Sequence, residues 1–265
     1  MGVVVRLLDA RTGSCTEIRP FRRGIVRLCA HVAESRSGLG VGTVRVLLTA
    51  DVLSRVVEMG GAQALTAFSF SCWSPQQALA VEQCVHALGM HPPATGVSSR
   101  DVHTTPDGPI DVHILPLGSP ADSQDGLLLP VAGAQVAGDH GNGTSVQELT
   151  ALDDPLALRL ALLSVPFGWQ AELTKAALIE ATSTLASLRR SVAEWAESRS
   201  APVPAQVAAS MRAAFDDLDC ATVVALLGSL AADTTLPAGA SFETAAFADR
   251  VLGLELTREI GRPRR

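Results

Sequence analysis

The 265-residue sequence predicts an α/β protein, in which a Rossmann-like parallel-sheet domain (residues 1–148) precedes an α-helical bundle domain (149–265). Two observations predict this fold class. In the first part, short apolar runs of strand length alternate with helical patterns, an order that favours parallel strands joined by crossover helices. From Thr150 onward every pattern is helical.

The first part begins with strands and continues with two helices. Valines and leucines from Val44 to Val56 recur at spacings of three and four, which predicts a helix that Gly60 ends. Ser74 and Pro75 are typical of a helix start. The expected helices are 40–59 and 74–88, and the expected strands are 3–8, 24–31, 64–70, 110–115 and 127–131.

The second part is expected to hold only helices. Acidic residues before Pro155 open the first of them, and the acidic run from Asp216 to Asp219 indicates another helix start, where the macrodipole favours negative charge. The expected helices are 156–164, 173–195, 207–215, 221–232 and 242–252.

Composition excludes several classes of protein. The chain is 47% apolar and 18% charged, too apolar for a disordered protein, and its net charge of −6 disfavours nucleic acid, including tRNA. No apolar run reaches the roughly 18 residues that span a bilayer, so no membrane partner is expected. The five cysteines are scattered and the start shows no leader pattern, which together indicate reduced thiols and a cytoplasmic location.

A glycine-rich turn between a strand and a helix is the candidate cofactor-binding segment. It holds Gly38, Gly40 and Gly42, and the basic residues near it are Arg36 and Arg45. Amides at a helix start could hold a phosphate or carboxylate there. A turn that merely packs a strand on a helix has the same pattern, and no P-loop lysine follows.

Four residues are candidates for chemistry. Cys29 and His31 lie two apart, so a strand would point both to one face. Two ligands are too few for zinc, which takes three or four from the protein, so no metal is expected. Asp111 and His113 lie at the end of a predicted strand, where they would face either a pocket or solvent.

Several blocks resemble one enzyme family in their order along the chain. They are VRLLDARTGSCTEIRP, LCAHVAES, VEQCVHALGMHPPA, ASMRAAFDDLDCATVVALLGSL and FADRVLGLEL. Together they resemble class I cysteinyl-tRNA synthetases and, more closely, the ligase that joins cysteine to glucosaminyl-inositol in mycothiol synthesis. The resemblance implies a catalytic domain of the HUP type of Rossmann fold. It also places Cys29 on the family's first zinc-binding cysteine.

The chain departs from this family at its catalytic signatures. The HIGH motif is replaced by the segment from Gly38 to Val41, which has no histidine. The KMSKS position falls on 135–139, which has no lysine, and the single lysine of the chain is Lys175. The later zinc segment of the family also has no counterpart. These departures predict that the ATP and zinc of the family are lost.

Two functions remain after these losses. In the first, the chain is a pseudoenzyme that has lost adenylation and acts as a binding or regulatory protein. Its partner would be a protein, a small metabolite or a second copy of itself. In the second, it is a retuned ligase or transferase acting on an amino acid, an aminoacyl thioester or a nucleotide in specialised metabolism. Cys29, His31, Asp111 and His113 are the candidates for that chemistry.

Overall fold

A five-stranded parallel sheet forms the centre of the protein. The computed structural model describes residues 5–9, 12–18, 24–32, 39–70, 74–98, 104–105, 108–119, 126–137, 153–233 and 235–262. The strand order is β5-β4-β3-β8-β9, and every neighbouring pair is parallel. The predicted Rossmann-like sheet is therefore confirmed. The strands are β3 (Ile25–His31), β4 (Gln63–Phe70), β5 (Thr95–Ser98), β8 (Val112–Pro116) and β9 (Leu127–Val131).

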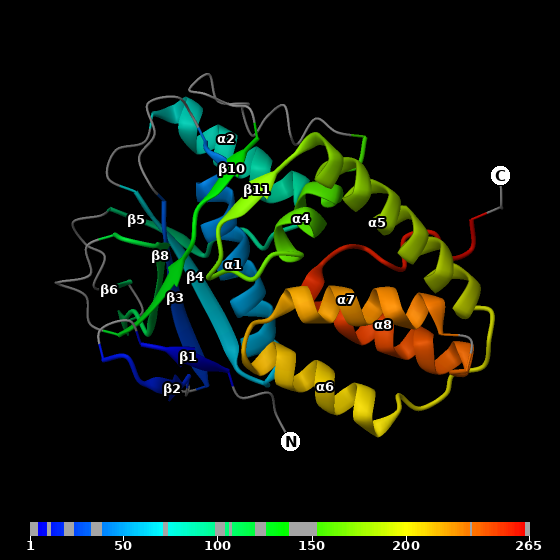
Figure 1. The fold of residues 1–265 in the computed structure, drawn as a ribbon. Helices are drawn as coiled ribbons and strands as arrows, with labels where there is room; N and C mark the ends of the chain where they lie inside the picture. The colour runs from blue at the N-terminus through cyan, green and yellow to red at the C-terminus, as the bar shows by residue number, and fades with distance from the viewer. Residues whose placement is uncertain are drawn as a thin grey trace.

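Two crossover helices join the first three strands, as the sequence predicts. Helix α1 (Val41–Met59) buries 15 of its 19 residues, because it lies between the sheet and the helical part of the chain (Figure 1). Helix α2 (Pro75–Ala87) begins with a capping box, in which the Ser74 side chain accepts from Gln77 N and the Gln77 side chain accepts from Ser74 N.

The helical part follows the expected order. Thr174 caps the second of its helices, and Asp219 caps the fourth by accepting from Thr222 N at 3.0 Å. No helix among the described residues is long and apolar enough to cross a membrane. The helices are α4 (Leu156–Leu163), α5 (Lys175–Trp195), α6 (Ala205–Asp216), α7 (Cys220–Ala232) and α8 (Ala238–Leu252).

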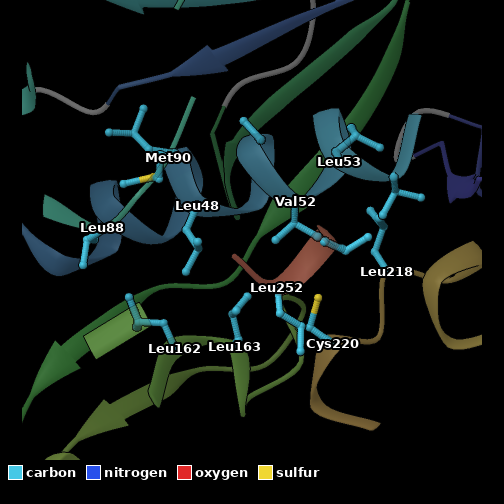
Figure 2. Close-up of a cluster of buried hydrophobic side chains, with 14 of the residues drawn as sticks. Leu48, Val52, Leu53, Leu88, Met90, Leu162, Leu163, Leu218, Cys220 and Leu252 are labelled. Atoms are coloured by element: carbon cyan, nitrogen blue, oxygen red, sulfur yellow. The ribbon is translucent and has the colours of Figure 1, made fainter. Parts of the chain in front are cut away.

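One apolar core extends from the sheet through α1 into the helices. Figure 2 shows Leu48 and Val52 of α1 facing Leu162, Leu163 and Cys220 from the helical part. The boundary expected between residues 148 and 149 lies outside the described residues. On either side of it, β10 (Ala134–Val136) and β11 (Ala171–Leu173) pair in parallel. The expectation that the second part holds only helices is therefore wrong at β11, because three residues are too few to show a strand period.

Short strand pairs account for the remaining β-structure. The strand expected at 3–8 is described only as the three-residue β1 (Arg6–Leu8), which pairs antiparallel with β2 (Cys15–Glu17). A second small pair joins β6 (Thr104–Thr105) to β7 (Gly108–Pro109). These partners and β5 could not be predicted from the sequence, because short polar runs carry no clear hydrophobic period.

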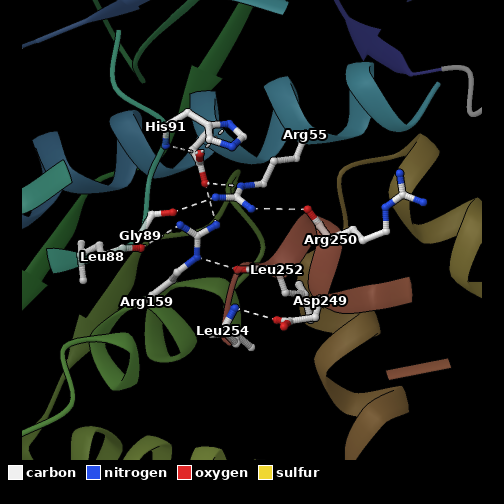
Figure 3. Close-up of polar contacts among 10 residues, drawn as sticks. Arg55, Leu88, Gly89, His91, Arg159, Asp249, Arg250, Leu252 and Leu254 are labelled. Atoms are coloured by element: carbon white, nitrogen blue, oxygen red, sulfur yellow. Dashed lines mark hydrogen bonds and ion pairs between the residues drawn. The ribbon is translucent and has the colours of Figure 1, made fainter. Parts of the chain in front are cut away.

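A fully buried arginine ties α1 to the helical part. From α4, the Arg159 guanidinium donates to Leu88 O at 3.0 Å, to Leu252 O at 2.5 Å and to Asp51 Oδ2 at 2.6 Å (Figure 3). Leu88 follows the last residue of α2 and Leu252 ends α8, where helix carbonyls lack partners within their own helix. One side chain therefore joins four helices.

The carboxylate of Asp51 is shared by several donors. Arg55 Nε donates to Oδ2 at 2.9 Å, and the His91 backbone N–H donates to Oδ1 at 2.9 Å. Burial by itself raises the pKa of Asp51, but the guanidiniums of Arg159 and Arg55 and these hydrogen bonds outweigh it. The pKa of Asp51 consequently lies below its usual value.

A second buried arginine holds the segment that follows α8. Arg189 of α5 donates to Glu255 O at 3.1 Å and to Leu254 O at 2.7 Å, and its Nη1 is paired with the Asp154 carboxylate. The Asp249 carboxylate accepts from Leu254 N at 2.7 Å. This segment is thus fixed from both sides by side chains that belong to other helices or to α8 itself.

We predict that Arg159→Lys lowers the free energy of unfolding by about 3 kcal/mol, because one ammonium cannot span three separated acceptors. Urea denaturation of the full chain measures the change. The matched control is Arg190→Lys on the exposed side of α5, which should change stability by less than about 0.5 kcal/mol. Equal effects of the two substitutions would contradict a joining role for Arg159.

We also predict that Asp51→Asn destabilises the protein most at neutral pH. A lowered folded-state pKa gives stability that is present above the unfolded value, about 3.9, and is lost as pH falls through the folded value. The stability gap between the parent chain and the variant should therefore be constant near neutrality and shrink on acidification. A gap that widens below about pH 4 would contradict the assigned direction.

Candidate functional site

One face of the central sheet carries a stripe of polar residues. Val26, Leu28 and Ala30 of β3 enter the main core, so the alternate residues Arg27, Cys29 and His31 point to the opposite face. Parallel sheets covered on both faces usually have apolar side chains on both. The polar stripe therefore marks this face as the candidate site.

Three of the four predicted residues meet on this face. His31 Nε2 and His113 Nδ1 are 3.0 Å apart, and the ring centroids are 5.2 Å apart. The Cys29 sulfur and a nitrogen of each imidazole all lie within 4.8 Å of one another. Cys29 and His113 are completely buried, whereas His31 is partly exposed. The three side chains are called the Cys-His-His cluster below.

The register of two neighbouring strands creates this cluster. Asp111 and His113 were expected to end a strand, and this is wrong, because β8 begins at Val112. The strand is displaced so that its first residues pair with the last residues of β3, and Cys29 lies directly opposite His113. The displacement brings His113 to the carboxyl end of β3, where ligands bind in open α/β sheets.

Asp111 has a different role from the other three candidates. Its carboxylate accepts from the Arg27 backbone N–H at 2.7 Å, which ties the start of β8 to β3. Burial raises the pKa of Asp111, and this hydrogen bond only partly offsets the effect. Among the described atoms, the buried Nε of Arg27 has no hydrogen-bond partner. We assign Asp111 to strand positioning, since it is not a member of the cluster.

Without an ion, Cys29 and His31 are both uncharged at neutral pH. Burial raises the pKa of the Cys29 thiol to about 12. Burial, followed by the neighbouring His113, lowers the pKa of His31 to about 4. Since the thiolate is the reactive form of cysteine, Cys29 in this state is a poor nucleophile.

The glycine-rich turn is only partly described. Gly38 and Arg36 lie outside the described residues. Gly40 caps α1 with open space around it, but a side chain at Gly42 would lie 3.7 Å from the Ala134 backbone nitrogen and oxygen. The start of α1 is thus packed against β10 at Gly42, as expected of a turn that packs against its neighbours.

Arg45 is buried, and its guanidinium is surrounded by backbone carbonyl oxygens. Its exposed fraction is 2%. The guanidinium donates to oxygens of five residues in the two loops that follow β9 and α4. These are Ala132 (3.2 Å), Gly133 (2.9 Å), Val165 (3.1 Å), Pro166 (2.7 Å) and Trp169. Of the two basic residues near the turn in sequence, Arg45 is therefore already bound to backbone oxygens.

The single lysine lies closer to the glycine-rich part of the fold than its sequence position indicates. Lys175 is exposed and is the first residue of α5. It follows β11 directly, and β11 pairs with β10, which contains Gln135 and Val136. Residues 138 and 139, which complete the position of the second family signature, lie outside the described residues.

Comparisons with known proteins give little further information. No protein-family profile matches the chain, and no curated protein matches it. A similar solved structure is a Campylobacter jejuni protein described provisionally as an arginyl-tRNA synthetase. It is 10% identical, with 87% of this chain and 91% of that chain covered and a TM-score of 0.49. We draw no conclusion about activity from a likeness at this level.

We predict that Gly126→Ala disturbs the strands that carry the cluster. Gly126 precedes β9 with a φ of +103°, and a Cβ there would lie 2.8 Å from Ile110 O and 2.9 Å from Asp111 O. Gly118, with a φ of +87° and open space around it, is the matched control.

The control substitution Gly118→Ala should cost about 1 kcal/mol from backbone strain alone. Gly126→Ala should exceed this by at least about 1.5 kcal/mol, because rigid backbone atoms cannot move aside. Urea denaturation of both variants measures the difference. Equal losses would mean that the close approach of β9 to Asp111 contributes nothing.

Proposed function

We propose that this chain is a binding or regulatory protein that is related to the cysteinyl-tRNA synthetases and the mycothiol cysteine ligase and has lost adenylation. The blocks quoted above support the relationship. The observation that carries the loss of activity is the bonding of Arg45, whose guanidinium is surrounded by five backbone carbonyl oxygens.

Adenylation needs cationic or hydrogen-bonding groups aimed at the charge that develops on phosphorus. Removing one preorganised donor typically costs about 10²- to 10³-fold in rate. This chain lacks the two signature histidines and the signature lysines, and Arg45 is not available as a replacement. Several losses of this size together leave no efficient route to an aminoacyl-adenylate.

A binding role fits what the fold retains. The polar face of the sheet offers imidazole and thiol groups at the carboxyl end of β3, where a small metabolite would enter an α/β protein. A protein partner or a second copy of the chain would be held by the outer surface instead. We propose no tRNA partner, because the chain is acidic.

A second candidate function is a retuned ligase or transferase acting on an amino acid, an aminoacyl thioester or a nucleotide. The meeting of Cys29, His31 and His113 favours it, since convergent polar groups are what new chemistry requires. The raised pKa of Cys29, about 12, disfavours a thiolate nucleophile in the ion-free cluster. A stoichiometric protein that co-purifies with the chain favours the first candidate, whereas conversion of a small molecule bound at the cluster into a product favours the second.

ATP–pyrophosphate exchange tests the central part of the proposal. With cysteine, Mg²⁺ and high concentrations of the full chain, we expect no cysteine-dependent exchange above the blank. An active cysteinyl-tRNA synthetase in the same assay is the positive control. Cysteine-dependent exchange by this chain would overturn the proposal, most directly if Lys175→Ala abolished it.

A further inference from the structure

The geometry points to a divalent metal site formed by Cys29, His31 and His113, with zinc as the ion that best suits these donors. One sulfur and two imidazole nitrogens are ligands that zinc takes in proteins. The three donor atoms lie within 4.8 Å of one another. Within the described parts of the chain, no other group of three such side chains meets this criterion.

The donor distances are close to those that a metal requires. Tetrahedral zinc, with bonds of about 2.0 Å to nitrogen and 2.3 Å to sulfur, separates its ligand atoms by about 3.3 to 3.6 Å. The two imidazole nitrogens are 3.0 Å apart, and no pair in the cluster exceeds 4.8 Å. Binding therefore needs the nitrogens to separate slightly and the sulfur to approach them by at most about 1.2 Å.

The two imidazoles already point nitrogen to nitrogen. In the ion-free cluster one of these nitrogens carries the hydrogen that the other accepts. On metal binding, that hydrogen moves to the other nitrogen of the same ring, and both facing lone pairs bind the ion. The Cys29 sulfur forms its bond to the metal as its S–H bond breaks. One proton is released for each ion bound.

The strands hold this arrangement in place before any ion binds. Cys29 and His113 are directly opposite in paired strands, and His31 follows Cys29 by two residues on the same face. Ala67 and Ile110 pack beside Cys29 and leave its sulfur in an apolar environment. Donors on rigid central strands lose little conformational entropy when they bind a metal.

The site has an open position. Three protein ligands leave a fourth coordination position for water or for a donor atom of a small molecule, which is the arrangement of reactive rather than structural zinc. His31 is the partly exposed member of the cluster and gives an ion its access from the carboxyl end of β3. This proposal replaces the expectation that the chain binds no metal, which rested on the two donors that the spacing of Cys29 and His31 provides. His113, 82 residues from His31, supplies the third donor.

Cobalt binding tests this site directly, because Co²⁺ replaces zinc and is coloured. We would strip the tag-free full chain with a chelator and titrate it with Co²⁺. We expect equimolar binding, the visible bands of tetrahedral cobalt, a sulfur-to-cobalt charge-transfer band, and loss of all three on addition of Zn²⁺. A metal-free hydrogen-bonded pair of histidines would give none of these signals.

Variants assign the signal to its ligands. Cys29→Ser should remove the charge-transfer band, and His31→Gln should weaken binding at least about 100-fold, more than the loss of an outer-shell partner. Cys84→Ser is the matched control, since Cys84 is an equally buried thiol on α2 outside the cluster. It should keep the full spectrum.

Several results would overturn the assignment. They are no equimolar binding by the parent chain, or a charge-transfer band that survives in Cys29→Ser or disappears in Cys84→Ser. Circular dichroism verifies that each variant is folded. If Cys29→Ser does not fold, His31→Gln decides, because His31 is only partly buried, and undiminished cobalt affinity in that variant would reject the site.

Discussion

The fold depends above all on buried arginine side chains that donate to backbone carbonyl oxygens. Arg159 is fully buried and Arg45 nearly so, yet each guanidinium is surrounded by acceptors from several segments. The carbonyl acceptors of Arg159 lie where α2 and α8 end, at positions whose carbonyls have no partner within the helix, whereas those of Arg45 lie in the loops that follow β9 and α4. Arginine carries five donors in a rigid plane, whereas lysine carries three on one atom. Of the 21 basic residues in this chain one is lysine, so nearly every basic side chain is an arginine that can donate to several acceptors at once.

The same interaction shapes the proposed function. Arg45 stands one turn into α1, beside the glycine-rich turn, where a free cation would serve a phosphate. Its five carbonyl acceptors instead fix the loops that follow β9 and α4. The Arg45 side chain cannot both fix these loops and bind a phosphate, and in this structure it fixes the loops. The polar groups that remain for ligand binding lie on the other side of the sheet, around Cys29.

Much of the fold could be predicted because long elements carry strong periodicity. The apolar spacing predicts α1, the Ser-Pro start predicts α2, and the apolar run predicts β9. In each case the signal lies within the element itself. The pairing of β10 with β11 could not be predicted. Both strands are three residues long, and their partners are distant in sequence.

The candidate site was predictable by residue type but not by geometry. Sequence spacing identified Cys29 and His31 as neighbours, because alternate strand residues share a face. It could not place His113 with them, since the stagger of β8 against β3 is set by packing along the whole sheet. Nor could it show that the Asp111 carboxylate accepts from a backbone amide or that the Arg45 guanidinium donates to backbone carbonyl oxygens. Such contacts depend on which backbone groups are left unpaired in the folded chain.

Hydrogen–deuterium exchange at the start of α1 tests most directly whether structural use of Arg45 excludes a nucleotide. Amide exchange over residues 39–45 would be compared with and without saturating ATP and Mg²⁺. We predict identical exchange in the two states, because the Arg45 guanidinium is already bound to carbonyl oxygens and offers the phosphates no cation. Slower exchange at Gly40 to Thr43 in the presence of ATP would contradict it.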